Sequence, residues 1–122
     1  MSHGGHQRKP DELDESFAHV VADTMQALST PSRLRILGRL HAGPCSVNEL
    51  AEEVGMEASA VSHQLRLLRH LGLVAGQREG RNVVYSLHDE HVGQLLDEAI
   101  AHVEHLYLAR TRTPADAQLA EA

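Results

Sequence analysis

Three histidines and an aspartate lie in one segment toward the C-terminal end of the chain. The sequence has ten histidines in 122 residues, and the segment 89–110 carries Asp89, His91, His102 and His105. An α-helix turns by about 100° per residue, so a step of eleven residues returns to within about 20° of its start. His91 and His102 would then share a face, with His105 beside them. Imidazole nitrogens and carboxylate oxygens are ligands for zinc, nickel and cobalt, so this pattern indicates a transition-metal site.

One helix cannot bring these side chains to a single ion. His91 and His102 would lie about 16 Å apart along the axis at about 1.5 Å per residue, whereas a metal–nitrogen bond is about 2 Å long. An antiparallel second copy, crossing near residues 97–98, would place His91 of one protomer level with His102 and His105 of its partner. We therefore expect a homodimer with a metal site between its subunits. The alternative is a set of surface histidines on an interface helix.

The elements that would carry these residues are five helices and a β-hairpin. Apolar residues at helical spacing, punctuated by Gly and Pro, predict helices over residues 11–28, 31–41, 46–54, 57–71 and 89–110. We expect one face of the first helix to be buried. Thr30 and Ser46 have the positions of N-caps, and Gly55 that of a C-cap. Two short strands, 73–77 and 82–87, flank a tight basic turn at residues 78–81.

These elements predict a mainly α fold with a small hairpin, in which a helix-turn-helix is followed by a wing. We expect one winged-helix domain over residues 11–110. Residues 1–10 are predicted to form a flexible arm that contains histidines, and residues 111–122 a flexible tail, because both are polar and lack apolar periodicity.

The helix over residues 57–71 has an apolar face and a polar face that suits a DNA major groove. The chain has a net charge of −6, yet residues 59–81 carry four arginines against one glutamate, and a duplex contacts a patch rather than a whole chain. We expect Gln64 and Arg66 to pair with base edges. The alternative is an ordinary amphipathic helix. The candidate DNA-binding residues are Ser59, Ser62, His63, Gln64, Arg66 and Arg69 on the helix, and Arg78 and Arg81 on the wing.

Three motifs in this order resemble one family of regulators. They are residues 28–37 (LSTPSRLRIL), 59–69 (SAVSHQLRLLR) and 80–87 (GRNVVYSL), and they are similar to motifs of the ArsR/SmtB family of metal-responsive repressors. The resemblance implies a dimeric winged helix that is joined through its first and last helices, with a sensing site on the last helix. The family's other common site uses cysteines, but Ser46 and Asn48 occupy those positions and Cys45 is offset.

The choice of metal depends on the N-terminal arm. His3 and His6 could add nitrogen ligands to the helix set and raise the coordination number from four to six, which suits nickel or cobalt, whereas four ligands in a tetrahedron suit zinc. Residues 97–100 (DEAI) and 104–106 (EHL) resemble the nickel- and cobalt-sensing members of the family. We therefore predict Ni(II) or Co(II) as the effector, with Zn(II) as the alternative.

The predicted function is a repressor that binds operator DNA as a dimer and dissociates when metal binds. Alternatives are an activator with a weak metal response, a metal buffer, or a metal-dependent hydrolase. A hydrolase is disfavoured because no general base or nucleophile pair is evident, so we expect no enzyme activity. Cys45 is the only cysteine, which excludes an internal disulfide. No signal peptide or membrane-spanning segment is evident, and a cytoplasmic protein without membrane contact is expected.

Overall fold

The computed structural model describes residues 8–111 and shows five α-helices and a small antiparallel sheet. His3, His6 and the tail beyond residue 111 lie outside the described residues. The sheet has the order β1-β3-β2. The elements are a 3₁₀ turn η1 (Pro10–Glu12), α1 (Glu15–Ala27), α2 (Pro31–Ala42), β1 (Cys45–Ser46), α3 (Val47–Val54), α4 (Ala58–His70), β2 (Val74–Glu79), β3 (Asn82–Leu87) and α5 (Glu90–Thr111).

Side-chain caps set the ends of the helices around the helix-turn-helix. The Thr30 hydroxyl accepts from the backbone N–H of Arg33 at the start of α2. Ser46 and Glu49 form a reciprocal capping box at the start of α3, which holds the pKa of the Glu49 carboxyl below its ordinary value. Gly55 ends α3 with a φ of 70°, a left-handed conformation that favours glycine. The predicted caps are therefore confirmed.

Three local features differ from the sequence expectations. The first helix begins at Glu15 rather than near residue 11, because the Asp14 side chain accepts from the N–H of Phe17 and caps it there. The short strand β1 is not predicted from the sequence, and it pairs with β3 opposite Tyr85. The hairpin turn is shorter than expected, because β2 extends to residue 79 and only Gly80 and Arg81 separate the strands.

The core lies where α2, α3 and α4 meet the sheet and the first turns of α5. Its side chains are apolar, and no buried polar or charged residue occurs in the part of the chain that the structure describes. Apolar side chains at helical spacing thus join the helix-turn-helix and the wing into one unit. The most fully buried residues include Ile36, Leu37, Leu50, Val61, Leu65, Leu68, Val74 and Leu96.

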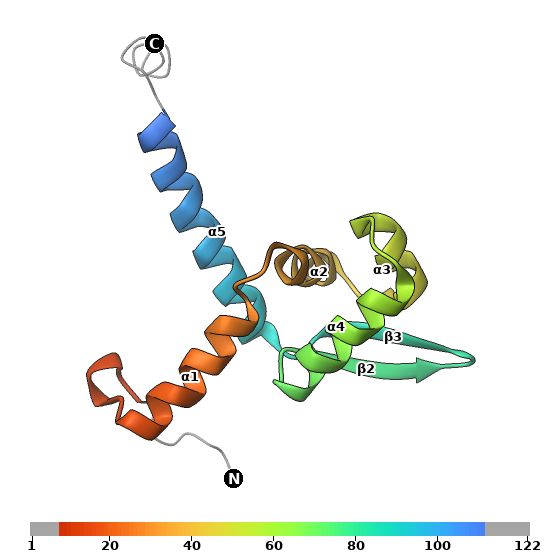
Figure 1. Ribbon diagram of the computed structural model, residues 1–122, viewed down its shortest axis with the longest axis horizontal. Coiled ribbons are helices and arrows are strands. Elements are labelled where there is room, and N and C mark those ends of the chain that lie inside the picture. The colour runs from red at the N-terminus through yellow and green to blue at the C-terminus, as the bar shows by residue number, and fades with distance from the viewer. Residues whose placement is uncertain (1–7, 112–122) are drawn as a thin grey trace.

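Helices α1 and α5 lie on the opposite side of α2 from the helix-turn-helix and the hairpin, and the outer half of α5 projects away from the rest of the chain (Figure 1). The predicted buried face of α1 is only partly covered in the single chain, since Phe17 and Val21 are half-buried but Val20 is 57% and Met25 51% exposed. The outer half of α5 is likewise apolar and exposed. Its exposed large side chains are Ile100, Val103, Leu106, Tyr107 and Leu108.

Candidate functional site

Helix α4 presents a polar face to solvent. Val61, Leu65 and Leu68 form its buried stripe. At about 100° per residue, the positions that point most directly away from this stripe include Ser59, His63 and Arg66, and all three are exposed. Ser62 and Gln64 lie on the flanks and are half-buried, and Arg69 is exposed on a flank. All six helical candidates therefore have some solvent access.

Gln64 is held by a residue of another helix. Its Oε1 accepts a hydrogen bond of 2.9 Å from Nε of Arg33, which projects from α2. Both side chains are half-buried. The sequence predicts that Gln64 pairs with base edges, and the structure shows that its oxygen already accepts a hydrogen bond within the protein.

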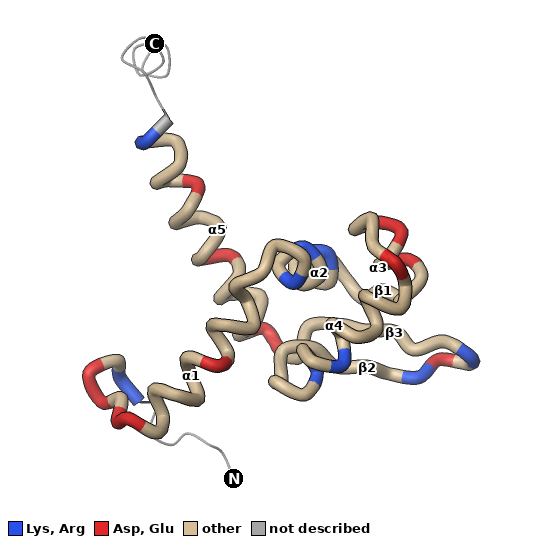
Figure 2. Tube along the Cα trace, viewed as in Figure 1, with Lys and Arg blue, Asp and Glu red and all other residues tan. Residues whose placement is uncertain are grey.

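The hairpin extends the basic surface beyond α4. Arg78, next to the last residue of β2, and Arg81 in the turn are both exposed, and Figure 2 shows basic positions on both sides of an acidic one around the tip of the hairpin. Gly80 has a φ of 66° at the first position of this two-residue turn, where the turn type requires a positive φ. The hairpin therefore carries two guanidinium groups away from the core, where they could reach a bound duplex.

Asp89 and His91 lie together at the base of α5. The Asp89 carboxylate accepts from the N–H of Val92 at 3.2 Å and so caps the helix, while its other oxygen is 3.6 Å from Nδ1 of His91. Partial burial raises the pKa of Asp89, but the Val92 N–H and the nearby His91 outweigh it, so this pKa lies below its ordinary value. The carboxylate is therefore charged at neutral pH. The His91 side chain is 80% exposed.

His102 and His105 lie on the projecting half of α5 and are exposed. They share a stripe of the helix with His91, and His102 lies about 16 Å further along the axis at about 1.5 Å per residue. Within residues 8–111 of one chain, no three His, Cys, Asp or Glu side chains gather closely enough to hold a metal ion. The four predicted ligands are thus divided into two pairs on one helix, and a single protomer does not complete the site.

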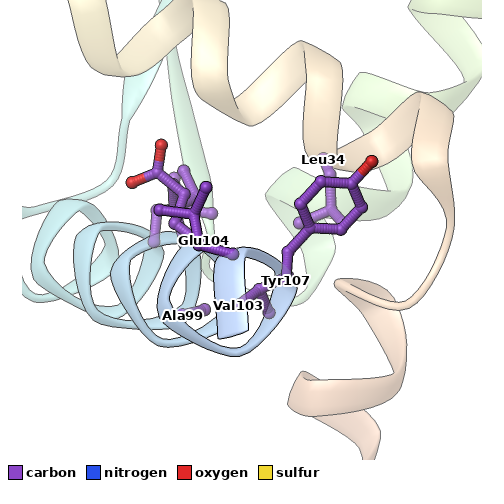
Figure 3. Close-up of a pocket in the computed structure, with 8 residues that line it drawn as sticks. Leu34, Ala99, Val103, Glu104 and Tyr107 are labelled. Atoms are coloured by element: carbon purple, nitrogen blue, oxygen red, sulfur yellow. The ribbon is translucent and has the colours of Figure 1, made fainter. Parts of the chain in front are cut away.

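An apolar hollow of about 440 Å³ adjoins the histidine-bearing helix. Figure 3 shows Val103, Glu104 and Tyr107 of α5 and Leu34 of α2 around it, and the lining is otherwise aliphatic. Leu34, Ile100, Val103, Tyr107 and Leu108, which line it, are each more than 40% exposed in the single chain.

Comparisons with known proteins agree with this architecture. HTH-type transcriptional regulator NmtR of Mycobacterium tuberculosis (strain ATCC 25618 / H37Rv) is 62% identical over 110 residues, which cover 88% of this chain and 92% of that protein. The pattern of the family described as "Bacterial regulatory protein, arsR family" matches residues 30–75. The chain belongs to the ArsR family. It is a transcriptional regulator with a winged helix-turn-helix DNA-binding domain, as the motifs predicted.

Two solved structures and one further relative extend this comparison. The transcriptional repressor SmtB homolog of Synechocystis sp. (strain ATCC 27184 / PCC 6803 / Kazusa) is 42% identical and covers 80% of this chain and 74% of its own length. The solution structure of apo-NmtR has a TM-score of 0.69 at 59% identity, over 93% of this chain and 98% of that one. A winged helix-turn-helix domain from Mycobacterium bovis, described as homodimeric, has a TM-score of 0.74 at 27% identity, over 92% of this chain and 99% of that one.

The relatives named above are regulators or repressors rather than enzymes, in agreement with the expectation from the sequence. Among residues 8–111, no helix is both long and apolar enough to span a lipid bilayer.

Two contacts in this ArsR-family chain are not predicted from the sequence. Arg33 lies within the motif of residues 28–37, but the motif does not show which helix its guanidinium reaches. Nε2 of His41 on α2 lies 2.8 Å from Oδ1 of Asp97 on α5, and neither residue belongs to a motif that would pair them. Helical periodicity identifies the exposed face of each helix but not the partner that faces it, so the sequence held no signal for either pair.

Proposed function

We propose that this protein is a metal-sensing repressor, which binds operator DNA as a homodimer and releases it when Ni(II) or Co(II) binds between the subunits. The division of the ligands along α5 carries this proposal. Asp89 and His91 lie at the base of the helix, and His102 and His105 on its projecting half. Only a second chain can bring the two pairs together, since the helix itself holds them about 16 Å apart.

A homodimer through α1 and α5 supports this arrangement. Val20 and Met25 on α1, and the five large apolar side chains on the projecting half of α5, are more than 40% exposed in one chain. Covering such a surface with a second copy removes it from water and stabilises the pair. Because a two-fold interface uses the same patch on both chains, antiparallel α5 helices would create two identical sites.

The donor set fits a divalent transition metal. Three imidazoles and one carboxylate are nitrogen and oxygen ligands of the kind that nickel, cobalt and zinc accept. The Asp89 carboxylate is charged, because its pKa is lowered, and the His91 ring is free to rotate toward a partner helix, because it is 80% exposed. His3 and His6 of the arm would supply the further ligands that favour nickel and cobalt over zinc.

The proposed DNA-binding elements, α4 and the hairpin, lie on the other side of α2 from the projecting half of α5 (Figure 1), so metal and operator would not compete for the same atoms. Ser59, His63 and Arg66 would enter the major groove, and Arg78 and Arg81 would reach the flanking backbone. A bound metal would bridge the two α5 helices and stabilise a dimer that spaces the two α4 helices poorly for the operator. By thermodynamic reciprocity, operator DNA weakens metal binding by the same factor.

Mixing two deficient variants tests whether the site lies between subunits. We expect His91→Ala and His102→Ala homodimers each to lose high-affinity metal binding. A heterodimer of the two combines the intact His91 of one chain with the intact His102 of the other, and therefore regains one site per dimer. Titration with Co(II), followed by its ligand-field absorption, measures this recovery.

A histidine outside the proposed ligand set supplies the control for this experiment. His70→Ala changes an exposed histidine on α4 and should retain both sites. No recovery when the two deficient variants are mixed would show that the site is not shared between the chains.

The arm decides between nickel or cobalt and zinc. Deleting residues 1–6 is expected to weaken Ni(II) and Co(II) binding and metal-driven operator release, while Zn(II) binding stays nearly intact, because the four α5 ligands satisfy a tetrahedral ion. Isothermal titration of full-length and truncated dimers with each metal measures this difference. If truncation leaves nickel affinity and operator release unchanged, the zinc-sensor alternative is favoured.

A further inference from the structure

The hydrogen bond between Arg33 and Gln64 determines which edge of the Gln64 amide is available for DNA. Arginine carries only hydrogen-bond donors, so the group 2.9 Å from its Nε must be the amide oxygen. This chemistry fixes the orientation of an amide whose oxygen and nitrogen are otherwise hard to tell apart. The Gln64 oxygen therefore faces α2, and the two N–H donors of Nε2 face away from it.

The donor edge of Gln64 is the one left for a ligand. Nε2 has no hydrogen-bond acceptor among residues 8–111, and Gln64 remains partly exposed on a flank of α4, next to the exposed His63. A donor pair at this position can be satisfied only by water or by an acceptor on a bound molecule.

Base edges in the major groove differ in the donors and acceptors that they present. Glutamine pairs with adenine in two hydrogen bonds, for which its oxygen must accept from N6 while its nitrogen donates to N7. A glutamine whose oxygen is already engaged presents donors only. Guanine offers two acceptors, N7 and O6, and it is therefore the base that suits such a donor edge best.

We propose that Arg33 is a positioning residue that sets base specificity, because it holds Gln64 as a hydrogen-bond donor that selects guanine over adenine at one position of each half-site. This inference rests on the proposed function, in which α4 enters the major groove of an operator. It assigns to α2, outside the helix-turn-helix, a part in determining sequence preference.

Selection from a randomised DNA duplex library with the full-length, metal-free protein tests the inference. The position that Gln64 governs is the one at which Gln64→Ala loses discrimination. At that position we expect wild type to prefer guanine over adenine by at least about fivefold, the lower range for a good base contact. Arg33→Met should reduce the preference to less than about twofold, because the freed amide can rotate and accept from adenine. Fluorescence anisotropy on duplexes that differ only at this position measures both ratios.

Two further variants separate positioning from folding and from charge. Gln64→Glu keeps an acceptor for Arg33 but has no N–H donor, so it should fold normally and lose the guanine preference. Arg35→Met removes the same charge from an exposed position of the same helix, and it should keep the preference. In the Gln64→Ala background, Arg33→Met should change the base preference no further.

Other outcomes would overturn the inference. Arg33 is a phosphate contact instead if Arg33→Met weakens binding equally for every base and reduces the slope of log affinity against log salt concentration by about one. A wild type that has a defined site but favours adenine at the Gln64 position refutes this inference alone. A wild type that binds all duplexes alike refutes operator recognition as well, so the two failures are distinguishable.

Discussion

Replacing Gly93 by alanine sets two effects of similar size against each other. Gly93 lies in α5, where alanine stabilises a helix by about 0.5–1 kcal/mol relative to glycine. A Cβ at this position would lie 2.8 Å from Cε1 of His41, so the imidazole must move. The ring is the end of a flexible side chain that is 37% exposed, and its movement breaks the contact with Asp97. Exposed pairs of this kind contribute about 0–1 kcal/mol. We therefore expect Gly93→Ala to change the free energy of unfolding by between about −0.5 and +1 kcal/mol.

The same substitution at Gly76 provides the contrast. A Cβ there would lie 2.9 Å from Cε1 of Tyr85 and 3.2 Å from Cγ1 of Val83. Tyr85 is only 8% exposed, so its ring cannot leave without displacing the core. Overpacking of this kind typically costs about 1–3 kcal/mol, and the smaller gain from replacing glycine leaves a net loss of about 1–2 kcal/mol for Gly76→Ala.

Urea unfolding followed by circular dichroism measures both variants, at one protein concentration because dimerisation contributes to stability. His41→Ala supplies the control. In that background the clash is absent, and Gly93→Ala should stabilise the protein by about 0.5–1 kcal/mol. A destabilisation of about 2 kcal/mol or more for Gly93→Ala alone would show that His41 is not free to move. A neutral Gly76→Ala would show that Tyr85 is not confined.

Three further predictions concern the cap of α5, the wing and the dimer. Asp89→Ser should keep the cap and lose metal affinity, whereas Asp89→Ala should also lower the melting temperature. The folded-state pKa of Asp89 is lowered. Its contribution to stability is therefore present above the ordinary pKa of aspartate and is lost as the pH falls through the lowered pKa. Acid unfolding of wild type and Asp89→Ala checks this. Replacing Arg78 and Arg81 by methionine should weaken binding to all duplexes alike. The slope of log affinity against log salt concentration should fall by about one for each phosphate that is no longer neutralised. Fluorescence anisotropy at several salt concentrations measures both effects. Val103→Glu places a charge on the exposed apolar face of α5 and should shift the protein to monomers in analytical ultracentrifugation; a variant that stays dimeric would contradict the proposed interface.

Local sequence was enough to predict the helix-turn-helix and its wing. Thr30, Ser46 and Gly55 act within a few residues of themselves, so their cap positions could be predicted without knowledge of the rest of the chain. The apolar stripe of α4 is equally local, because helical periodicity alone separates its buried face from its exposed one. The histidine pattern of α5 also comes from the sequence, and its assignment as a metal site stays a prediction.

The side chains that meet across elements could be identified only in the folded chain. Arg33 and Gln64 are 31 residues apart in sequence, and His41 and Asp97 are 56 apart. The sequence predicts a buried face on α1, and its own chain covers that face only in part. Periodicity shows that a face is apolar but not whether its own chain or a second copy covers it. Such contacts depend on how whole helices and strands pack against one another. The spacing of residues within one helix does not show which element, or which chain, will contact each of its faces.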